Sequence, residues 1–153
     1  MIYRKAKIED VPIIQQLINN YANRGLMLAK PLIAIYENLR EYVIAEDEKT
    51  GQITGVGGLH ILWDDLAEVR SLAVAEPYFK QGIGRELVHR LEADAKSLGL
   101  PQVFALTYQT DFFKKLGYTE IENKLLPQKV WMECINCPKF PDCDERAVLK
   151  KLE

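Results

Sequence analysis

The chain has 153 residues, the usual length of one domain, and we expect a single domain over residues 1–153. Its composition, 48% hydrophobic and 27% charged, is typical of a globular protein. A formal net charge of -2 excludes the basic surface expected of a nucleic-acid-binding protein. No apolar run approaches the about 20 residues that a membrane span requires. The strand-like start, Met1 to Lys5, lacks a secretory signal, so we expect a cytoplasmic protein.

The first part of the chain predicts one short strand and two helices. The strand covers residues 2–6. Asp10 can cap the helix that follows, and Pro12 is tolerated in its first turn. Apolar residues then recur at helical spacing, and they are Val11, Ile14, Leu17, Ile18 and Tyr21. Residues 23–25 end this helix, and a second helical pattern runs from Leu28 to Leu39.

The period then changes, and three strands joined by short turns follow at residues 42–45, 53–62 and 66–75. A long helix is predicted from Gly82 to Leu98, with Gly99 as its stop. The last part predicts a buried strand at residues 103–106 and a short helix at residues 111–116. A further strand, a cysteine-bearing loop and a final strand near residues 147–149 follow. The element order is β-α-α-β-β-β-α-β-α-β-β. It indicates the mixed α/β (α+β) class, with a single sheet flanked by helices.

The turn before the long helix has the composition of an anion site. A strand ends near Ala75, and Gly82-Ile83-Gly84 opens the helix, so that glycines allow close approach to main-chain N–H groups with no helical partners. Lys80 and Arg85 add positive charge to the positive end of the helix dipole. A pyrophosphate fits this arrangement. The alternative is a tight turn without a ligand, because Gly-x-Gly alone is weak evidence.

Three segments in order resemble the motifs of the GCN5-related N-acetyltransferases, and the resemblance covers nearly the whole chain. They are Glu68 to Val74, the turn ending at Gly84, and Phe112 to Tyr118. The resemblance implies the fold of that family, a mostly antiparallel central sheet flanked by helices, and acetyl-CoA as co-substrate. It implies that the pantetheine arm pairs with the main chain of one segment and that the turn binds the pyrophosphate. The residues concerned are Leu72, Ala73, Val74, Lys80, Gln81, Gly82, Ile83, Gly84 and Arg85.

Further segments are similar to short amino-acid N-acetyltransferases of the N-acetylglutamate synthase type, which opens arginine biosynthesis. They are residues 27–32, 36–39, 65–74, 104–107 and 137–144. This similarity implies that the acceptor is the amine of an amino acid, with L-glutamate favoured. Members of that type tend to carry Arg where this chain has Lys30, and Lys lacks the bidentate fork of Arg. The change leaves the acceptor open.

Acetyl transfer to an amine requires a base, stabilisation of the carbonyl oxygen and, in some enzymes, an acid for the leaving thiolate. Glu68 is the predicted base, since it shares a strand face with Arg70, Leu72 and Val74 and matches the position of the base in the resembling family. The alternative is an inconsequential ion pair with Arg70. The N–H group of Leu72 is the predicted oxyanion donor. Tyr108 is a candidate acid, although it can instead be a packing residue.

An acceptor with two carboxylates would require cationic side chains to bind them. Lys30, Arg70 and Lys129 are the predicted substrate-binding residues, with a solvated surface charge as the alternative for each. A protein lysine or a polyamine as acceptor would instead favour an acidic groove. A non-catalytic module that senses coenzyme A or binds metal is the third interpretation. A homodimer is compatible with the sequence.

Cys134, Cys137 and Cys143 form a cluster near the end of the chain, and Cys-x-x-Cys spacing suits zinc. A closed structural site usually needs four ligands, and only three thiols are present. Metal binding, a redox pair and ordinary reduced thiols all remain open, and ordinary thiols are favoured. We therefore predict no metal.

Overall fold

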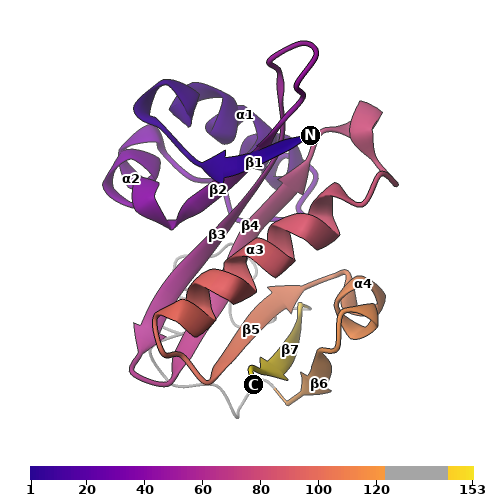
Figure 1. Ribbon diagram of the computed structural model, residues 1–153. Coiled ribbons are helices and arrows are strands. Elements are labelled where there is room, and N and C mark those ends of the chain that lie inside the picture. Colours follow the sequence, from indigo (N-terminus) through magenta and orange to yellow (C-terminus); the bar gives the residue numbers. More distant parts are fainter. Residues whose placement is uncertain (123–144) are drawn as a thin grey trace. The chain divides into compact units, whose positions relative to one another are not determined.

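The computed structural model describes residues 1–122 and 145–153 (Figure 1). The helical elements are η1 Ile8–Asp10, α1 Val11–Ala22, α2 Leu32–Glu37, η2 Leu39–Glu41, η3 Glu76–Tyr78, α3 Ile83–Ser97 and α4 Thr110–Lys115. The strands are β1 Ile2–Lys5, β2 Tyr42–Glu46, β3 Ile53–Trp63, β4 Leu66–Val74, β5 Gln102–Thr107, β6 Thr119–Ile121 and β7 Arg146–Lys151. The predicted order of helices and strands is confirmed.

The strands form one sheet of seven, in the order β1-β2-β3-β4-β5-β7-β6. The pairs β1–β2, β2–β3, β5–β7 and β6–β7 are antiparallel. The pair β4–β5 is parallel, with Ala67 opposite Val103 and Glu68 opposite Phe104. The predicted mixed, mostly antiparallel sheet is therefore confirmed.

The chain divides into two compact units. The first contains Met1–His60 and Val69–Asp94, and the second contains Ile61–Glu68 and Ala95–Glu153. The second unit has a small apolar core on β3, β4, β5 and β7, formed by Leu62, Leu66, Phe104 and Ala147. The first unit carries all of the predicted coenzyme-binding residues.

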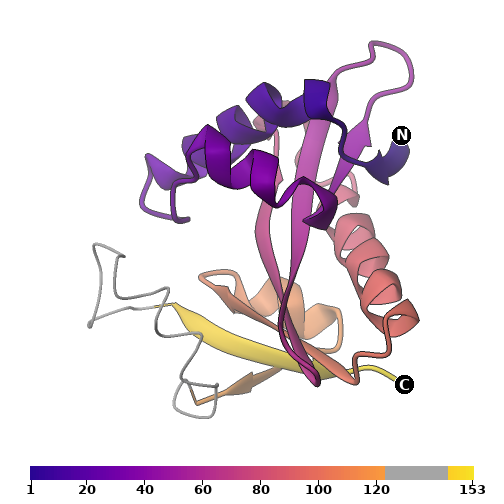
Figure 2. The ribbon, with the colours of Figure 1, turned by 90° about the vertical axis from the view of Figure 1, so that its left-hand side faces the viewer.

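Helices cover both faces of the strands in the first unit (Figure 2). α1 and α2 pack on one face, around a core formed by Val11, Ile14, Leu17, Ile18, Ile35, Tyr42, Ile44, Val56 and Ala73. α3 packs on the other face, against the glycine-rich stretch of β3. A Cβ atom at Gly55 would lie 3.0 Å from Ile83 Cγ2, and one at Gly57 would lie 3.1 Å from Leu91 Cδ1. These two glycines therefore let α3 lie close to the sheet.

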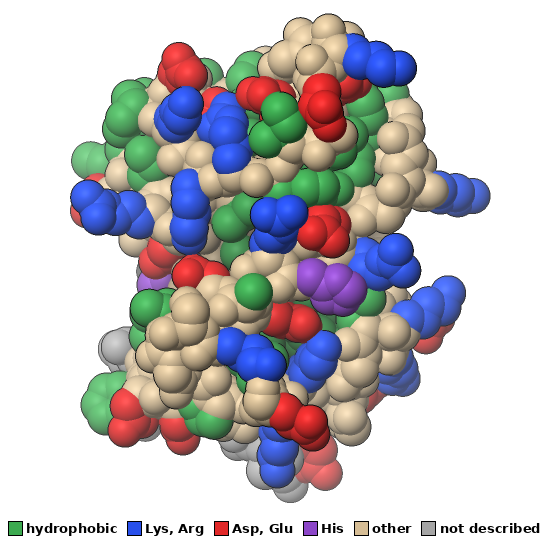
Figure 3. Space-filling view, in the orientation of Figure 1, with side chains coloured by type: hydrophobic (Ala, Val, Ile, Leu, Met, Phe, Trp, Pro, Cys, Tyr) green, Lys and Arg blue, Asp and Glu red, His purple; other side chains and the backbone are tan. Residues whose placement is uncertain are grey.

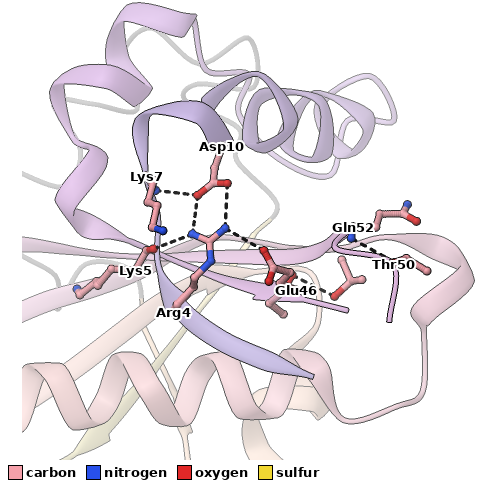
Figure 4. A network of polar contacts seen from close by, with 9 residues as sticks. Arg4, Lys5, Lys7, Asp10, Glu46, Thr50 and Gln52 are labelled. Atoms are coloured by element: carbon pink, nitrogen blue, oxygen red, sulfur yellow. Dashed lines mark hydrogen bonds and ion pairs between the residues drawn. The ribbon is translucent and has the colours of Figure 1, made fainter. Parts of the chain in front are cut away.

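The start of α1 is fixed by a buried carboxylate in a way that the sequence did not predict (Figure 4). Asp10 occupies the N-cap position of α1, but its side chain makes no cap hydrogen bond there. Its carboxylate instead accepts the N–H of Lys7 at 2.7 Å and two hydrogen bonds from Arg4, at 2.8 and 3.1 Å. Arg4 also donates to Glu46 at 3.1 Å. Asp10 thus bonds to Arg4 of β1, which in turn bonds to Glu46 of β2, rather than capping the helix.

The second helix is shorter than its apolar pattern predicted. α2 begins at Leu32 and ends at Glu37, and Leu28 lies outside it. Pro31 is the N-cap residue, with ψ of 156°. A proline disfavours helical geometry in the residue before it, so helical structure cannot extend back through this position to Leu28.

The end of α3 agrees with prediction. Gly99 has φ of +87°. Its N–H donates to Lys96 O at 3.0 Å, and the N–H of Leu100 donates to Ala95 O at 3.0 Å. These two bonds form the Schellman arrangement, in which a left-handed glycine satisfies the last carbonyls of a helix.

The surface carries both signs of charge. Lys and Arg side chains are interspersed with Asp and Glu side chains on the face drawn in Figure 3. This distribution fits the nearly balanced composition of the chain. Within residues 1–122 and 145–153, none of the helices has the length and apolar character needed to span a bilayer.

Candidate functional site

The turn between β4 and α3 adopts the open geometry that an anion site requires. Lys80 and Gly82 both have left-handed backbones, with φ of 65° and 81°. Lys80, Gln81, Gly82 and Arg85 are exposed, and a Cβ atom at Gly82 would meet no other heavy atom within 4 Å. The main chain of the turn is therefore accessible from solvent.

The N–H groups of this turn are available to a ligand. Gly82 O accepts the N–H of Glu86 at 3.1 Å, which is the first hydrogen bond of α3. The N–H groups of Ile83, Gly84 and Arg85 thus belong to the first turn of the helix, where no helical acceptor exists. In the described part of the chain, no hydrogen bond uses the N–H of Lys80, Gln81 or Gly82. This cluster of donors, at the positive end of the helix dipole, suits a pyrophosphate.

The strand that leads into the turn has the predicted alternation. Side chains from Glu68 to Val74 are half-buried and buried in turn. Leu72 faces α3, because its Cδ1 would lie 3.2 Å from a Cβ atom at Gly57, whereas Ala73 belongs to the core under α1 and α2. The carbonyl oxygen of Val74 accepts a hydrogen bond from the Tyr21 hydroxyl at 2.8 Å. The predicted pantetheine segment is thus anchored from α1.

Ser71 breaks the regular geometry of β4. Its φ of 56° is left-handed, a conformation typical of a β-bulge when it occurs within a strand. The side chain of Ser71 forms a hydrogen bond with Tyr42. Burial raises the pKa of Tyr42, and the hydrogen bond with Ser71 and the positive charge of Arg70 offset part of this rise. Left-handed non-glycine residues are costly and occur often at functional sites. Ser71 directly precedes the predicted pantetheine segment, and neither it nor Tyr42 was singled out by the sequence pattern.

The two candidate proton-transfer residues lie in the second unit. Glu68 is half-buried on β4, in register with Phe104 on β5. Tyr108 is half-buried and directly follows the end of β5 at Thr107. Their roles as base and acid stay predictions.

The predicted substrate cations are spread along the chain. Lys30 is half-buried, directly before Pro31, and its carbonyl oxygen accepts a hydrogen bond from Gln15 Nε2 at 3.2 Å. Arg70 is half-buried on β4. Lys129 lies outside the described residues. Substrate binding by these residues stays a prediction.

The three cysteines, Cys134, Cys137 and Cys143, also lie outside the described residues. Within residues 1–122 and 145–153, there is no group of three His, Cys, Asp or Glu side chains that could hold a metal ion. His60 on β3 places Nδ1 2.9 Å from Glu41 Oε2.

Comparison with known proteins gives consistent matches. Residues 14–118 match the model of the acetyltransferase (GNAT) family. An uncharacterized N-acetyltransferase of Chlorobaculum tepidum, CT2212, is 41% identical over 149 residues, which cover 97% of this chain and 95% of its own length. An amino-acid acetyltransferase of Mycobacterium tuberculosis is 41% identical over 133 residues, which cover 86% of this chain and 76% of that protein.

Two solved structures share the fold. The crystal structure of Rv2747 from Mycobacterium tuberculosis, in complex with CoA and NLQ, has a TM-score of 0.85 at 35% identity. The alignment covers 100% of this chain and 100% of that chain. N-acetylglutamate synthase from Neisseria gonorrhoeae, complexed with coenzyme A and N-acetyl-glutamate, has a TM-score of 0.89 at 22% identity. That alignment covers 99% of this chain and 35% of the synthase. This chain therefore corresponds to about a third of the longer enzyme.

Proposed function

Since the chain belongs to the acetyltransferase (GNAT) family, we propose that it transfers the acetyl group of acetyl-CoA to the amine of an amino acid, with L-glutamate as the acceptor. The family, the fold, the enzyme class and the acetyl-CoA co-substrate that the sequence predicted are confirmed. A cytoplasmic location and a homodimer stay predictions.

The observation that carries the proposal is the turn from Lys80 to Arg85. Its N–H groups lie at the start of α3, accessible to solvent and without acceptors among the described residues. A diphosphate bound there would gain several charge-assisted hydrogen bonds, and Lys80 and Arg85 would add attraction. When bound, acetyl-CoA supplies the activated thioester.

The acceptor is proposed from relatives. The M. tuberculosis amino-acid acetyltransferase is 41% identical to this chain over 133 residues. Longer amino-acid acetyltransferases, such as that of Azotobacter vinelandii, are 32% identical over 126 residues, which cover 29% of the longer protein. Glutamate would place this enzyme at the opening step of arginine biosynthesis, as the resemblance to N-acetylglutamate synthases implies.

In the proposed reaction, the neutral amine attacks the thioester carbonyl carbon, the new C–N bond forms and the C–S bond breaks. Glu68 takes the proton that the amine loses, and the N–H of Leu72 donates to the carbonyl oxygen as charge develops on it. Tyr108 gives a proton to the leaving thiolate. Lys30, Arg70 and Lys129 hold the carboxylates of the acceptor.

The experiment is a thiol-release assay with acetyl-CoA and a panel of amino acids that includes glutamate, glutamine and aspartate. Spermidine and a lysine-containing peptide serve as matched non-amino-acid acceptors. We expect turnover with glutamate above that with the other acceptors. Turnover with spermidine or the peptide alone would contradict the amino-acid acceptor, and no turnover with any amine would contradict the transferase activity.

A further inference from the structure

The turn from Lys80 to Arg85, called the coenzyme turn below, is preceded by η3. One side chain of η3 bonds to the distant hairpin between β2 and β3. The hydroxyl of Tyr78, the last residue of η3, donates a hydrogen bond of 3.1 Å to Asp47 Oδ2. It also forms a hydrogen bond with the side chain of Thr50. Asp47 and Thr50 belong to the turn between β2 and β3, so this contact joins residues 31 apart in the sequence.

The hairpin turn offers a rigid acceptor. Asp47 N–H donates to Gln52 O at 2.8 Å, and Gly51 N–H donates to Asp47 O at 2.7 Å. The other carboxylate oxygen of Asp47, Oδ1, accepts the N–H of Lys49 at 2.9 Å. The carboxylate is therefore oriented by its own turn before Tyr78 binds to it.

The coenzyme turn, by contrast, has little to hold its shape. The regular main-chain hydrogen bonds of η3 end with Phe79 N–H, which donates to Glu76 O at 3.1 Å. Lys80 then takes a left-handed conformation that costs a non-glycine residue free energy. Since the N–H groups of residues 80–82 bond to none of the described residues, the turn depends on the segments at its two ends. α3 fixes the far end, and Tyr78 lies two residues before the strained Lys80.

We propose that Tyr78, through its hydrogen bond with Asp47, is a positioning residue that holds the turn in its coenzyme-binding conformation. This inference rests on the proposed function, because it assigns the turn to acetyl-CoA. Without the bond, a smaller fraction of the free protein has the binding-competent turn, and the apparent Kd for coenzyme rises in inverse proportion to that fraction. Once coenzyme is bound, the turn is ordered by its ligand, so that kcat is retained.

The experiment compares Tyr78→Phe with the wild-type protein by calorimetric titration of CoA and by steady-state kinetics. We expect Kd for CoA and KM for acetyl-CoA to rise roughly 3- to 10-fold, the effect of one lost hydrogen bond, while kcat at saturation stays within about 2-fold. Tyr3→Phe is the matched control. It removes the hydroxyl of another half-buried tyrosine of the same unit and should leave both constants unchanged.

A double-mutant cycle tests the pairing itself. Asp47→Ala should weaken CoA binding to a similar extent, and Tyr78→Phe combined with Asp47→Ala should be no weaker than the weaker single variant. Asp47→Asn retains an oxygen for Lys49 N–H and an amide that can donate to the Tyr78 hydroxyl. It should bind CoA within about 2-fold of wild type.

Three results would overturn the inference. They are an unchanged Kd for CoA in Tyr78→Phe, strictly additive effects in the cycle, and a rise in Kd that is accompanied by a loss of thermal stability in the free protein well beyond that of Tyr3→Phe. The last result would assign Tyr78 to folding alone. If wild-type protein itself bound no CoA, the proposed function would fail instead, so the two failures are distinct.

Discussion

The hydroxyl of Tyr21, near the end of α1, donates a hydrogen bond of 2.8 Å to the main-chain carbonyl oxygen of Val74, the last residue of β4. The N–H of the next residue, Ala75, donates to Thr54 O at 2.8 Å. The end of β4 is thus held from a helix and from its neighbour in the sheet, directly before η3. This arrangement fixes the strand end before any ligand binds.

Tyr21→Phe should lower the free energy of unfolding by about 1 kcal/mol, because Val74 O loses a partly buried partner. Urea denaturation measures this change. Tyr36→Phe serves as the control, since Tyr36 is 44% exposed on α2, and its unfolding free energy should match wild type within about 0.5 kcal/mol. Equal stability of the two variants would contradict a stabilising role for the Tyr21–Val74 bond.

Asp10→Asn should destabilise the fold by about 2 kcal/mol. The side chain of Asp10 is only 4% exposed, and Asn cannot keep the charge-assisted pair with Arg4. The loss should stay below that of a fully buried pair, because Arg4 is 22% exposed and keeps Glu46 as a partner. Urea denaturation at neutral pH measures it, and a loss below about 0.5 kcal/mol would show that the pair contributes little.

The same carboxylate makes stability depend on pH. Burial raises the pKa of Asp10, but hydrogen bonds from Arg4 and from Lys7 N–H outweigh burial, so that its pKa lies below the usual value. Stability from this group is therefore complete above the unfolded pKa of about 4 and is lost as pH falls through the lower folded pKa. The difference in unfolding free energy between wild type and Asp10→Asn should be constant from about pH 5 to 7 and should narrow below about pH 4. A difference that widens in acid would contradict this sign.

Gly82→Ala should weaken CoA binding by roughly 10-fold. A Cβ atom there meets no neighbour within 4 Å, so the cost comes from the left-handed backbone, about 1–2 kcal/mol for a non-glycine residue. Gly99→Ala is the matched control, with φ of 87° and equally open surroundings at the end of α3. Gly99→Ala should lose stability in thermal unfolding and keep the wild-type Kd for CoA. In Gly82→Ala the free turn can leave the left-handed conformation, so the cost should appear mainly as a higher Kd for CoA in calorimetric titration. Equal CoA affinity in the two variants would contradict the binding of coenzyme by this turn.

Glu68→Gln should lower kcat by about 100-fold, the usual scale for a lost general base, with KM for acetyl-CoA little changed. Stopped or continuous thiol-release assays over a range of pH measure the effect. Glu120→Gln, a change of a surface carboxylate that pairs with Lys114, is the control and should turn over at the wild-type rate. A Glu68→Gln variant with full kcat would exclude Glu68 as the base.

The helices and strands could be predicted where one local pattern decides them. The helix from Ile83 to Ser97 and its stop at Gly99 follow from apolar spacing and a left-handed glycine, and both were predicted to within one residue. The apolar pattern from Leu28 to Leu39 was misleading, because Pro31 prevents the helix from extending back through it. Asp10 was correctly predicted to lie at the start of the first helix. Its hydrogen bond with Arg4 was not predicted, because Arg4 belongs to a different element, β1.

By itself, the sequence determined the open turn at residues 80–85 that we propose as the coenzyme site: a strand, two glycines and a helix start are adjacent along the chain, and their backbone geometry creates N–H donors without long-range contacts. Only the tertiary structure decided what holds that turn and its strand in place. Tyr21 reaches Val74 across 53 residues, and Tyr78 reaches Asp47 across 31. A tyrosine has the same local pattern whether it packs in a core or donates to a distant oxygen, so its partner is set by the fold.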